Sequence, residues 1–323
     1  LILRETCDSS TARMASAQLS SILSLLELAA RNRMIKVLSC VVCDGEIRKL
    51  RSALVSPFLA KRIWNRPPFC VDLVRCMSCG FMFYNPRLDD AEASRLFAGY
   101  RSEEYQRMRH ASEPWYTANF NAQLGAQAAY DRRRPVLAAI LRQHIGERKI
   151  GRVLDYGGDR GDLVCGLVDG TAAFVYDISG IPAVDGVTAT SDPAGCKADL
   201  VINSNVFEHV GFPRVLLEEI VKAIPHGGLV FLEVPRELPF GIARIFRRVA
   251  QLGIVALTRP ALARHVLRPA SLYLMHEHIN YFSEQSLATL IRSCGCSVIG
   301  AGSYVMDSGV EKAPMVWCLG TPT

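Results

Sequence analysis

The sequence predicts an α/β protein whose main part is a doubly wound, mostly parallel sheet, preceded by a small module that carries cysteine pairs. Three observations lead to this prediction. Short apolar runs alternate with helical patterns from residue 152 onward. A glycine-rich loop follows the first of these runs, and two C-x-x-C pairs stand near the N-terminus. The 323 residues leave room for one large core and a smaller unit.

The order of elements supports helices on both faces of the sheet, because parallel strands need crossover connections. Two helical stretches, 212–224 and 283–295, separate apolar runs. The predicted strands are residues 152–156, 172–177, 186–190, 198–203, 228–234, 297–304 and 314–320.

Composition excludes several classes of protein. Half of the residues are hydrophobic and 21% are charged, as is usual for a globular chain. The net charge of +6 permits phosphorylated partners without requiring them. The sequence lacks a basic stripe interleaved with aromatic residues, so we expect no binding of nucleic acid. No apolar run reaches the length of a transmembrane helix, so we expect a cytoplasmic protein.

Four segments divide the chain. Residues 1–37 are expected to be an N-terminal extension, poorly ordered or helical, because the apolar stretch inside it is a poor signal peptide. The other three are a metal-binding module at 38–84, a helical linker or lid at 85–129 that begins with Asp89 as N-cap, and the sheet domain at 130–323 with a basic helical insert at 236–275.

The loop after the first predicted strand reads Asp-Tyr-Gly-Gly-Asp-Arg-Gly, residues 155–161. Its glycines do not match the G-x-G-x-x-G loop of dinucleotide-binding domains, which disfavours a nicotinamide-dependent oxidoreductase. Glycine lets the backbone approach a ligand closely, and a ligand without phosphate needs no phosphate cradle. A plain strand and turn without a ligand is the alternative.

With this order of elements, residues 130–320 resemble the class I S-adenosylmethionine-dependent methyltransferases. The family's first motif, an acid followed by spaced glycines, is matched by Asp155, Gly157 and Gly161. The stretch ADLVINSNVFEHV, residues 198–210, resembles the family's fourth strand and the turn after it. The resemblance implies a Rossmann-like sheet of seven strands and S-adenosylmethionine as cofactor.

The resemblance also implies which residues hold this cofactor. Asp177 ends the second strand, where the family places an acid that hydrogen-bonds the ribose hydroxyls, although a nicotinamide enzyme uses an acid in the same way. Asp159 stands at the family's middle glycine, a departure that would reshape the pocket. The expected cofactor-binding residues are Asp155, Gly157, Gly158, Gly161, Asp177, Asp192, Asn203 and Ser204.

Two C-x-x-C pairs, Cys40 with Cys43 and Cys76 with Cys79, suit one tetrahedral Zn²⁺. Unrelated buried cysteines are the alternative. The stretch RCMSCGFMFYNP, residues 75–86, resembles the N-terminal zinc module of a methyltransferase branch that includes sugar C-methyltransferases, whose further C-terminal domain we do not expect here. The resemblance implies a zinc-ribbon-like module with structural zinc.

The stretch LMHEHINYF, residues 274–282, lies where that branch carries a Glu-His pair facing the substrate. The pair here is Glu277 and His278, and the resemblance implies that His278 acts as the base. An imidazole with a pKa near neutrality suits this proton transfer. If the segment is extended, His276 and His278 share a face, which leaves a two-histidine metal site open. His209, after the fourth strand, is the rival base.

Residues 236–268 contain seven arginines and one acid, Glu237. The stretch 240–257 can form a helix in which arginines flank an apolar stripe. We favour a cap over the pocket that grips a phosphorylated substrate. A helix resting on an anionic membrane surface and a simple solvated face are the alternatives.

These observations predict a methyltransferase that modifies a small-molecule acceptor at carbon or oxygen. Sugar nucleotides, glycans and natural-product intermediates are the expected acceptor classes, with a phosphorylated or nucleotide-linked acceptor suiting the arginines. The alternative is a catalytically inactive methyltransferase fold that binds partners through its zinc module. Binding of S-adenosylmethionine distinguishes the two.

Overall fold

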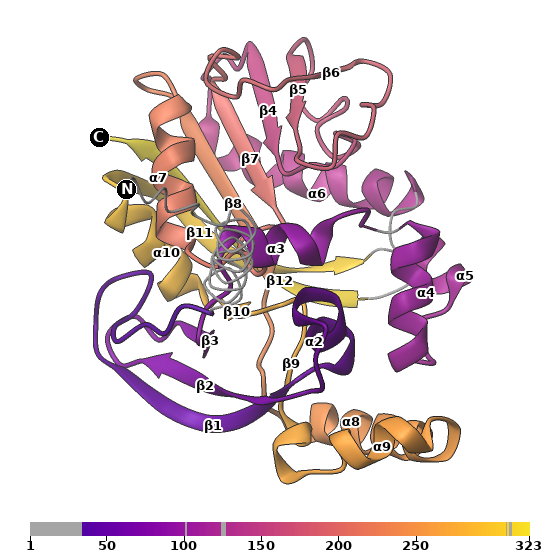
Figure 1. Cartoon of the computed structure of the whole chain (residues 1–323). Helices are drawn as coiled ribbons and strands as arrows, with labels where there is room; N and C mark the ends of the chain where they lie inside the picture. The colour runs from indigo at the N-terminus through magenta and orange to yellow at the C-terminus, as the bar shows by residue number, and fades with distance from the viewer. Residues whose placement is uncertain (1–33, 101, 124–126, 308, 310–311) are drawn as a thin grey trace, which may run out of the picture.

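A seven-stranded sheet forms the upper part of the computed structural model in Figure 1. The structure describes residues 34–100, 102–123, 127–307, 309 and 312–323. Residues 1–33 of the expected N-terminal extension therefore lie outside the described residues. The strands are β4 (Arg152–Tyr156), β5 (Ala172–Tyr176), β6 (Val187–Ala189), β7 (Leu200–Ser204), β8 (Leu229–Pro235), β11 (Cys296–Asp307) and β12 (Lys312–Pro322).

The sheet order is β11-β12-β8-β7-β4-β5-β6. The five strands from β8 to β6 run parallel to their neighbours, whereas β12 is antiparallel to β8 and β11 is antiparallel to β12. Each predicted strand is present. The expected doubly wound, mostly parallel sheet of seven strands is therefore confirmed.

Helices cover both faces because side chains of successive strand residues point in opposite directions. Val201 packs on one face in a cluster with helices α7 (Pro213–Ala223) and α10 (Glu284–Ser293). Its neighbour Leu200 packs on the other face, in a cluster with α6 (Gln127–Ile145). Both residues are almost completely buried. A parallel sheet buried on both sides produces the near-continuous apolar runs of the sequence.

A second sheet of five strands lies below the first in Figure 1. Its strands are β1 (Ile47–Val55), β2 (Cys70–Cys76), β3 (Met82–Asn85), β9 (Leu274–Met275) and β10 (Asn280–Tyr281), in the order β10-β3-β2-β1-β9. The segment 274–281, here called the strap, thus supplies both edges of a sheet whose other strands lie about two hundred residues earlier. Its histidines lie in the connection between the two edge strands.

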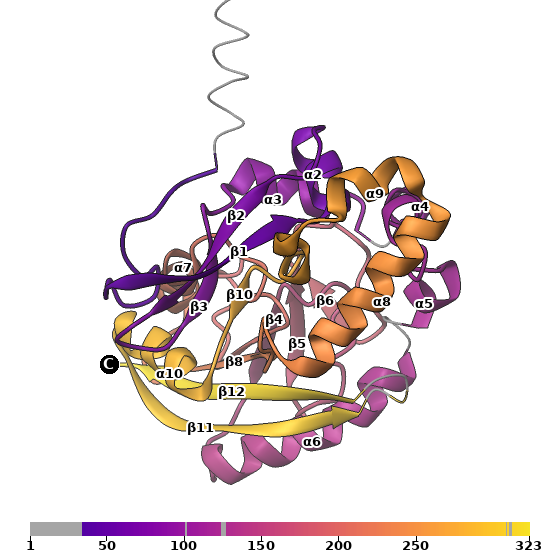
Figure 2. The same ribbon diagram turned by 90° about the horizontal axis from the view of Figure 1, so that it is seen from below.

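The described part of the chain contains further helices. They are α2 (Pro57–Trp64), α3 (Asp90–Phe97), α4 (Glu103–Ser112) and α5 (Ala118–Gln123), followed later by α8 (Ile242–Thr258), α9 (Pro260–Val266) and the 3-10 helix η1 (Pro269–Leu272). Asp89 caps α3 as predicted, since its carboxylate accepts a hydrogen bond of 2.7 Å from the Glu92 amide. Figure 2 shows α8 and α9 near the viewer, on the lower surface of the molecule.

Arg87 joins the two sheets. Its guanidinium is completely buried and donates to backbone carbonyls of Gly211 at 2.7 Å, Val210 at 2.9 Å and Tyr84 at 3.0 Å. It also donates to the side chain of Asn280 in β10, at 2.5 Å. One side chain therefore ties the end of β3, the loop after β7 and the strap together. Among the described residues, no helix is long and apolar enough to cross a membrane.

Replacing Arg87 with Met is expected to destabilise the fold by about 3 kcal/mol or more, because buried carbonyls lose their donor. Chemical denaturation of the purified variant measures this loss. Arg51→Met, at an exposed strand position, is the matched control and should change the free energy of unfolding by about 0.5 kcal/mol or less. Equal stability of the two variants would contradict the joining role of Arg87.

Candidate functional site

The carboxyl ends of the central strands gather the residues that the sequence assigns to a cofactor. Asp155 is the penultimate residue of β4 and is 1% exposed, and burial raises the pKa of its carboxyl to about 7. Gly158 lies against it, since an added Cβ would stand 2.1 Å from Asp155 Cγ. Gly157 and Gly161 have φ values of +80° and +78°, which disfavour other residues. The loop must therefore pass this close to the buried acid.

The departures from the glycine pattern have a structural explanation. Asp159 adopts φ +55°, a left-handed conformation that aspartate tolerates better than most residues. Its amide donates to Asp177 Oδ2 at 2.9 Å, and the Ser179 amide donates to Oδ1 of the same carboxylate at 2.8 Å. After the loop the chain continues through turns rather than a helix. Asp192 is exposed and closes a turn by accepting from the Gly195 amide.

Asn203 and Ser204 end β7 beside the loop. Asn203 is fully buried and donates from Nδ2 to the Tyr156 carbonyl at 2.7 Å. Ser204 donates to Glu233 Oε2 at 2.8 Å. Arg133 of α6 contacts both Ser204 and Glu233, and Tyr304 contacts the other Glu233 oxygen. The sequence did not predict this buried ion pair. Arg133 is one of several arginines in α6, and nothing in the pattern of that helix distinguishes it from its neighbours.

Several buried polar atoms at these strand ends have no hydrogen-bond partner within the described part of the protein. They are Asp155 Oδ1, Asn203 Oδ1, Asn205 Oδ1 and both carboxylate oxygens of Glu208. Buried polar atoms are nearly always paired, so such a concentration indicates a place for a polar ligand. The carboxyl ends of parallel strands are also where open α/β sheets bind ligands.

The backbone of the strap is fixed against the loop after β7. Amides of Ile279 and Asn280 donate to the Glu208 carbonyl at 2.8 and 3.0 Å. The Asn280 side chain donates to the Phe207 and Val210 carbonyls, each at 2.7 Å. These bonds bring the two histidine-bearing segments of the sequence side by side.

His209 and His278 consequently face each other, with ring centroids 4.9 Å apart. His209 Nδ1 donates to the Glu277 carbonyl at 2.9 Å, which leaves Nε2 as the unprotonated nitrogen. Burial lowers the pKa of His209 to about 3, so this ring is neutral. Glu208 lies beside it with Oε1 3.8 Å from Nε2, and burial raises the pKa of Glu208 to about 7.

His278 is paired with Glu237, a residue that the sequence noted only as the one acid of the basic insert. Its Nδ1 lies 3.0 Å from Glu237 Oε1. Burial alone would lower the pKa of His278, but the hydrogen bond and charge of Glu237 raise it to about 9. The expected near-neutral pKa is thus replaced by a higher one. We call Glu208, His209, Glu237 and His278 the histidine cluster.

Glu277 and His276 turn toward helix α4 instead. Arg109 Nη1 donates to Glu277 Oε2 at 2.8 Å, and Tyr105 contacts the other carboxylate oxygen. His276 Nε2 lies 2.5 Å from Glu113, which also accepts from Arg109 at 2.9 Å. The structure does not bring His276 and His278 to one metal site. Apart from the four cysteines, one group of described residues has ligand-type atoms that all lie within 4.8 Å of one another. This group consists of Glu208, His209 and His278.

The four predicted zinc ligands come together. Cys40 Sγ and Cys79 Sγ are 3.8 Å apart, Cys43 Sγ and Cys76 Sγ are 3.5 Å apart, and all four lie within 4.8 Å of one another. The hydrogen bond from Cys79 lowers the pKa of Cys40 to about 5. The cluster packs in the same core as one face of the seven-stranded sheet.

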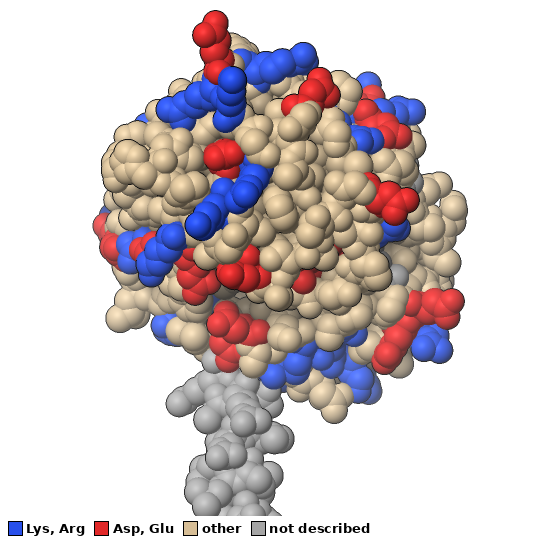
Figure 3. All heavy atoms as spheres, turned by 90° about the horizontal axis from the view of Figure 1, so that it is seen from above, with Lys and Arg blue, Asp and Glu red and all other residues tan. Residues whose placement is uncertain are grey.

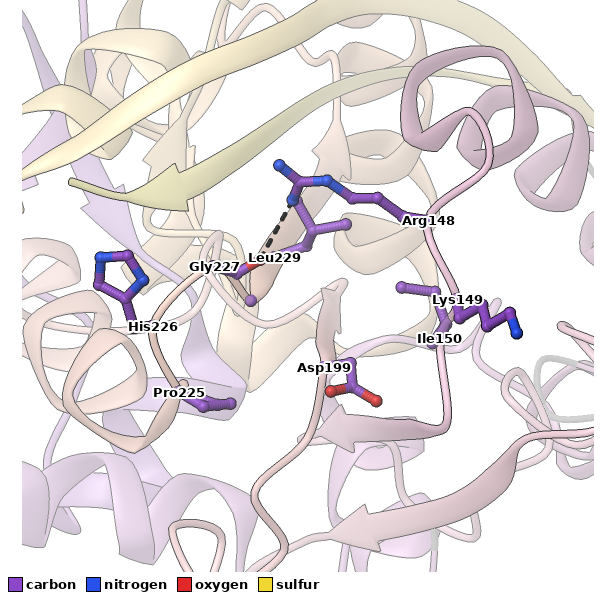
Figure 4. Close-up of a pocket in the computed structure, with 9 residues that line it drawn as sticks. Arg148, Lys149, Ile150, Asp199, Pro225, His226, Gly227 and Leu229 are labelled. Carbon is purple, nitrogen blue, oxygen red and sulfur yellow. Dashed lines mark hydrogen bonds between the residues drawn. The ribbon is translucent and has the colours of Figure 1, made fainter.

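A separate hollow of about 320 Å³ lies at the opposite edge of the sheet, as Figure 4 shows. It is lined by residues that precede β4, β7 and β8, among them Lys149, Asp199 and His226. Arg148 donates to the Gly227 carbonyl across it at 3.1 Å. None of the expected site residues lines this hollow, and amino ends of parallel strands are not where such sheets bind ligands.

Residues 126–300 match a protein family described as "Methyltransferase domain". The chain belongs to this methyltransferase family. The match covers more than half of the chain and includes the glycine loop, the turn after β7 and the strap. The expected class I methyltransferase fold is therefore confirmed. A comparison with curated proteins found no match.

Several solved methyltransferases are similar in fold. Human N-acetylserotonin methyltransferase with S-adenosylmethionine is 15% identical with a TM-score of 0.40, and the match covers 71% of this chain but only 58% of that one. A Burkholderia thailandensis 1,6-didemethyltoxoflavin-N1-methyltransferase with S-adenosylhomocysteine is 17% identical with a TM-score of 0.45 (76% and 97% covered). Magnesium protoporphyrin IX methyltransferase from Synechocystis is 14% identical with a TM-score of 0.41 (70% and 97% covered).

Proposed function

We propose that this methyltransferase transfers a methyl group from S-adenosylmethionine to a small-molecule acceptor. The observation that carries the proposal is the group of buried, unpartnered polar atoms at the ends of β4 and β7, directly beside a glycine loop and a histidine cluster. A fold that binds no ligand at these strand ends would leave the atoms unpaired, and each buried unpaired polar atom costs stability.

The residues at the strand ends fit the cofactor. Asp155 and Asn203 supply unpartnered oxygens for its polar methionine end, and Gly157 and Gly158 leave room for close backbone approach. Asp177 offers a carboxylate, anchored by two amides, for the ribose hydroxyls. When bound, S-adenosylmethionine supplies an electrophilic methyl group on a sulfonium.

The histidine cluster serves the acceptor. In the reaction the acceptor forms a bond to the methyl carbon, the carbon–sulfur bond breaks, and the acceptor's proton passes to a base. We assign this base to His278, whose Nδ1 is held by Glu237 and whose Nε2 remains for the acceptor. Its raised pKa makes it a strong base once it is deprotonated. Glu277 positions His209 through its backbone carbonyl and connects the cluster to α4.

The acceptor class is the finer part of the proposal. The cysteine cluster and the Glu277–His278 pair support the zinc-bearing branch that includes sugar C-methyltransferases, so a sugar nucleotide, glycan or related intermediate is proposed. A phosphorylated or nucleotide-linked acceptor suits Arg244, which contacts Glu237 on the acceptor side. Methylation at carbon or oxygen fits a histidine base equally well.

We propose that Cys40, Cys43, Cys76 and Cys79 hold one structural Zn²⁺. Neighbouring sulfurs in a tetrahedral zinc site lie about 3.8 Å apart, close to the two sulfur–sulfur distances of the cluster. Amides of Val42 and Cys79 point at these sulfurs, at 3.4 Å, and would stabilise thiolates.

Calorimetry tests the cofactor. Asp177→Ala is expected to weaken S-adenosylmethionine binding by about 1.5–3 kcal/mol, because charge-assisted hydrogen bonds to the ribose are lost. Asp169→Ala, an exposed acid in the turns after the glycine loop, is the control and should bind normally. A wild-type protein that does not bind the cofactor would favour the inactive-fold alternative.

Elemental analysis tests the zinc site. Protein kept under reducing conditions is expected to carry about one Zn²⁺ per chain, and Cys76→Ser should lose the metal and melt at lower temperature. Cys70→Ser, at an exposed cysteine outside the cluster, should keep both zinc and stability. Metal-free protein of full stability would show that the four cysteines are simply buried.

Turnover with an acceptor found by screening tests the base. His278→Ala should lower kcat by roughly 10²–10⁴ without changing cofactor affinity, and Glu277→Gln should cost less. Because only deprotonated His278 accepts the proton, kcat/KM should rise with pH through a midpoint near 9. Glu237→Gln should lower the pH of this midpoint, because the carboxylate that raises the pKa of His278 is lost. If His209 is the base instead, His209→Ala alone abolishes turnover and the pH profile is flat above about 4.

A further inference from the structure

Helix α8 presents apolar side chains to solvent. Ile242 is 76% exposed, Phe246 71%, Val249 52% and Leu257 86%. Spacings of four, three and eight residues place these side chains on one side of a helix with 3.6 residues per turn. Isolated exposed apolar residues are ordinary, but a continuous stripe along one helix marks a contact surface.

The stripe is not the face that holds α8 to the protein. On the opposite side of the helix, Leu252 and Val255 are buried in a cluster with Leu54 of β1 and Val266 of α9. Arg248 also points inward and donates to the Ser271 carbonyl at 2.8 Å. One face of the helix thus packs against the protein. The apolar side chains of the other face make no contribution to this packing. Leu238 and Phe240, just before α8, add exposed apolar area.

The surroundings of the stripe are basic. Residues 238–273 contain six arginines and neither aspartate nor glutamate. Arg247 on α8, Arg264 on α9 and Arg268 just beyond α9 are exposed, and residues 238–273 around them contain no acidic residue. Figures 1 and 2 show α8 and α9 on the lower surface of the molecule. On the opposite surface, Figure 3 shows acidic and basic residues intermingled.

We propose that α8 docks on an anionic lipid bilayer, with Ile242, Phe246, Val249 and Leu257 entering the headgroup region and the exposed arginines contacting lipid phosphates. Such a surface offers an apolar boundary and negative charge together, which matches both the stripe and the arginines. A second copy of the chain is a poorer occupant, because a two-fold contact would place the same arginines opposite one another. The contact is peripheral, since no described helix can span a bilayer.

The docked helix is connected to the histidine cluster. Arg244 of α8 contacts Glu237 Oε2 at 3.4 Å and donates to the Leu238 carbonyl at 2.8 Å, and Glu237 pairs with His278. Docking would therefore hold the acceptor side of the molecule near the bilayer surface. The docking itself does not depend on methyl transfer and is measured without substrate.

Vesicle sedimentation with the full chain tests the proposal. The protein should bind vesicles of phosphatidylglycerol and phosphatidylcholine, bind pure phosphatidylcholine vesicles at least about tenfold more weakly, and lose affinity as salt is added. The double variant Phe246→Ser with Leu257→Ser should bind anionic vesicles at least about tenfold more weakly. Val215→Ser, at a 54% exposed position of α7, is the matched control and should bind like the wild type.

A second variant separates the charge from the apolar stripe. Changing Arg247, Arg264 and Arg268 together to Gln should remove most of the preference for anionic vesicles, while thermal melting and S-adenosylmethionine binding stay unchanged. The proposal is overturned if the wild type binds neither vesicle, or if the Phe246/Leu257 variant binds like the wild type. It is also overturned if light scattering shows a dimer that the double variant abolishes while vesicle binding is absent.

Discussion

The buried guanidinium of Arg87 is the interaction on which the rest of the structure depends. A completely buried cation is costly unless acceptors surround it, and here backbone carbonyls and the Asn280 side chain do so. Burial lowers the pKa of Arg87 to about 9, yet it remains charged near neutral pH. Because its acceptors come from β3, the loop after β7 and β10, the two sheets cannot shift independently of this side chain.

This constraint explains why the histidine cluster has its geometry. Once Asn280 is held, the strap must run along the Glu208 carbonyl, and His209 and His278 meet at 4.9 Å. The two rings then acquire opposite properties from their surroundings. Burial keeps His209 uncharged, because the carbonyl that it contacts brings no compensating charge, whereas the Glu237 carboxylate beside His278 lets that ring hold its proton. Two histidines of similar local sequence thus become different chemical groups.

The same strap divides its own residues between two tasks. His278 belongs to the histidine cluster, while the side chains of Glu277 and His276 contact Arg109 of α4 and Glu113 at its end. These contacts connect the histidine cluster to α4, so a shift in the position of α4 would move Glu277 and the strap that carries His278. In contrast, the outward face of α8 has no role in holding this arrangement, which is why its apolar stripe points to a contact outside the chain.

The sequence by itself determined the features that arise from local patterns. Apolar runs predicted all seven strands, because a sheet covered on both faces buries most residues of its central strands β4, β7 and β8. The spaced glycines predicted a tight loop after the first strand, and the structure shows positive φ values and a close approach to Asp155 there. The tertiary structure decided the pairings between distant segments. Glu237 with His278 and Arg133 with Glu233 are separated by 41 and 100 residues, and no local period reports such distances. A charged residue looks the same in a sequence whether it faces water or a buried partner, so only the path of the chain could assign these roles.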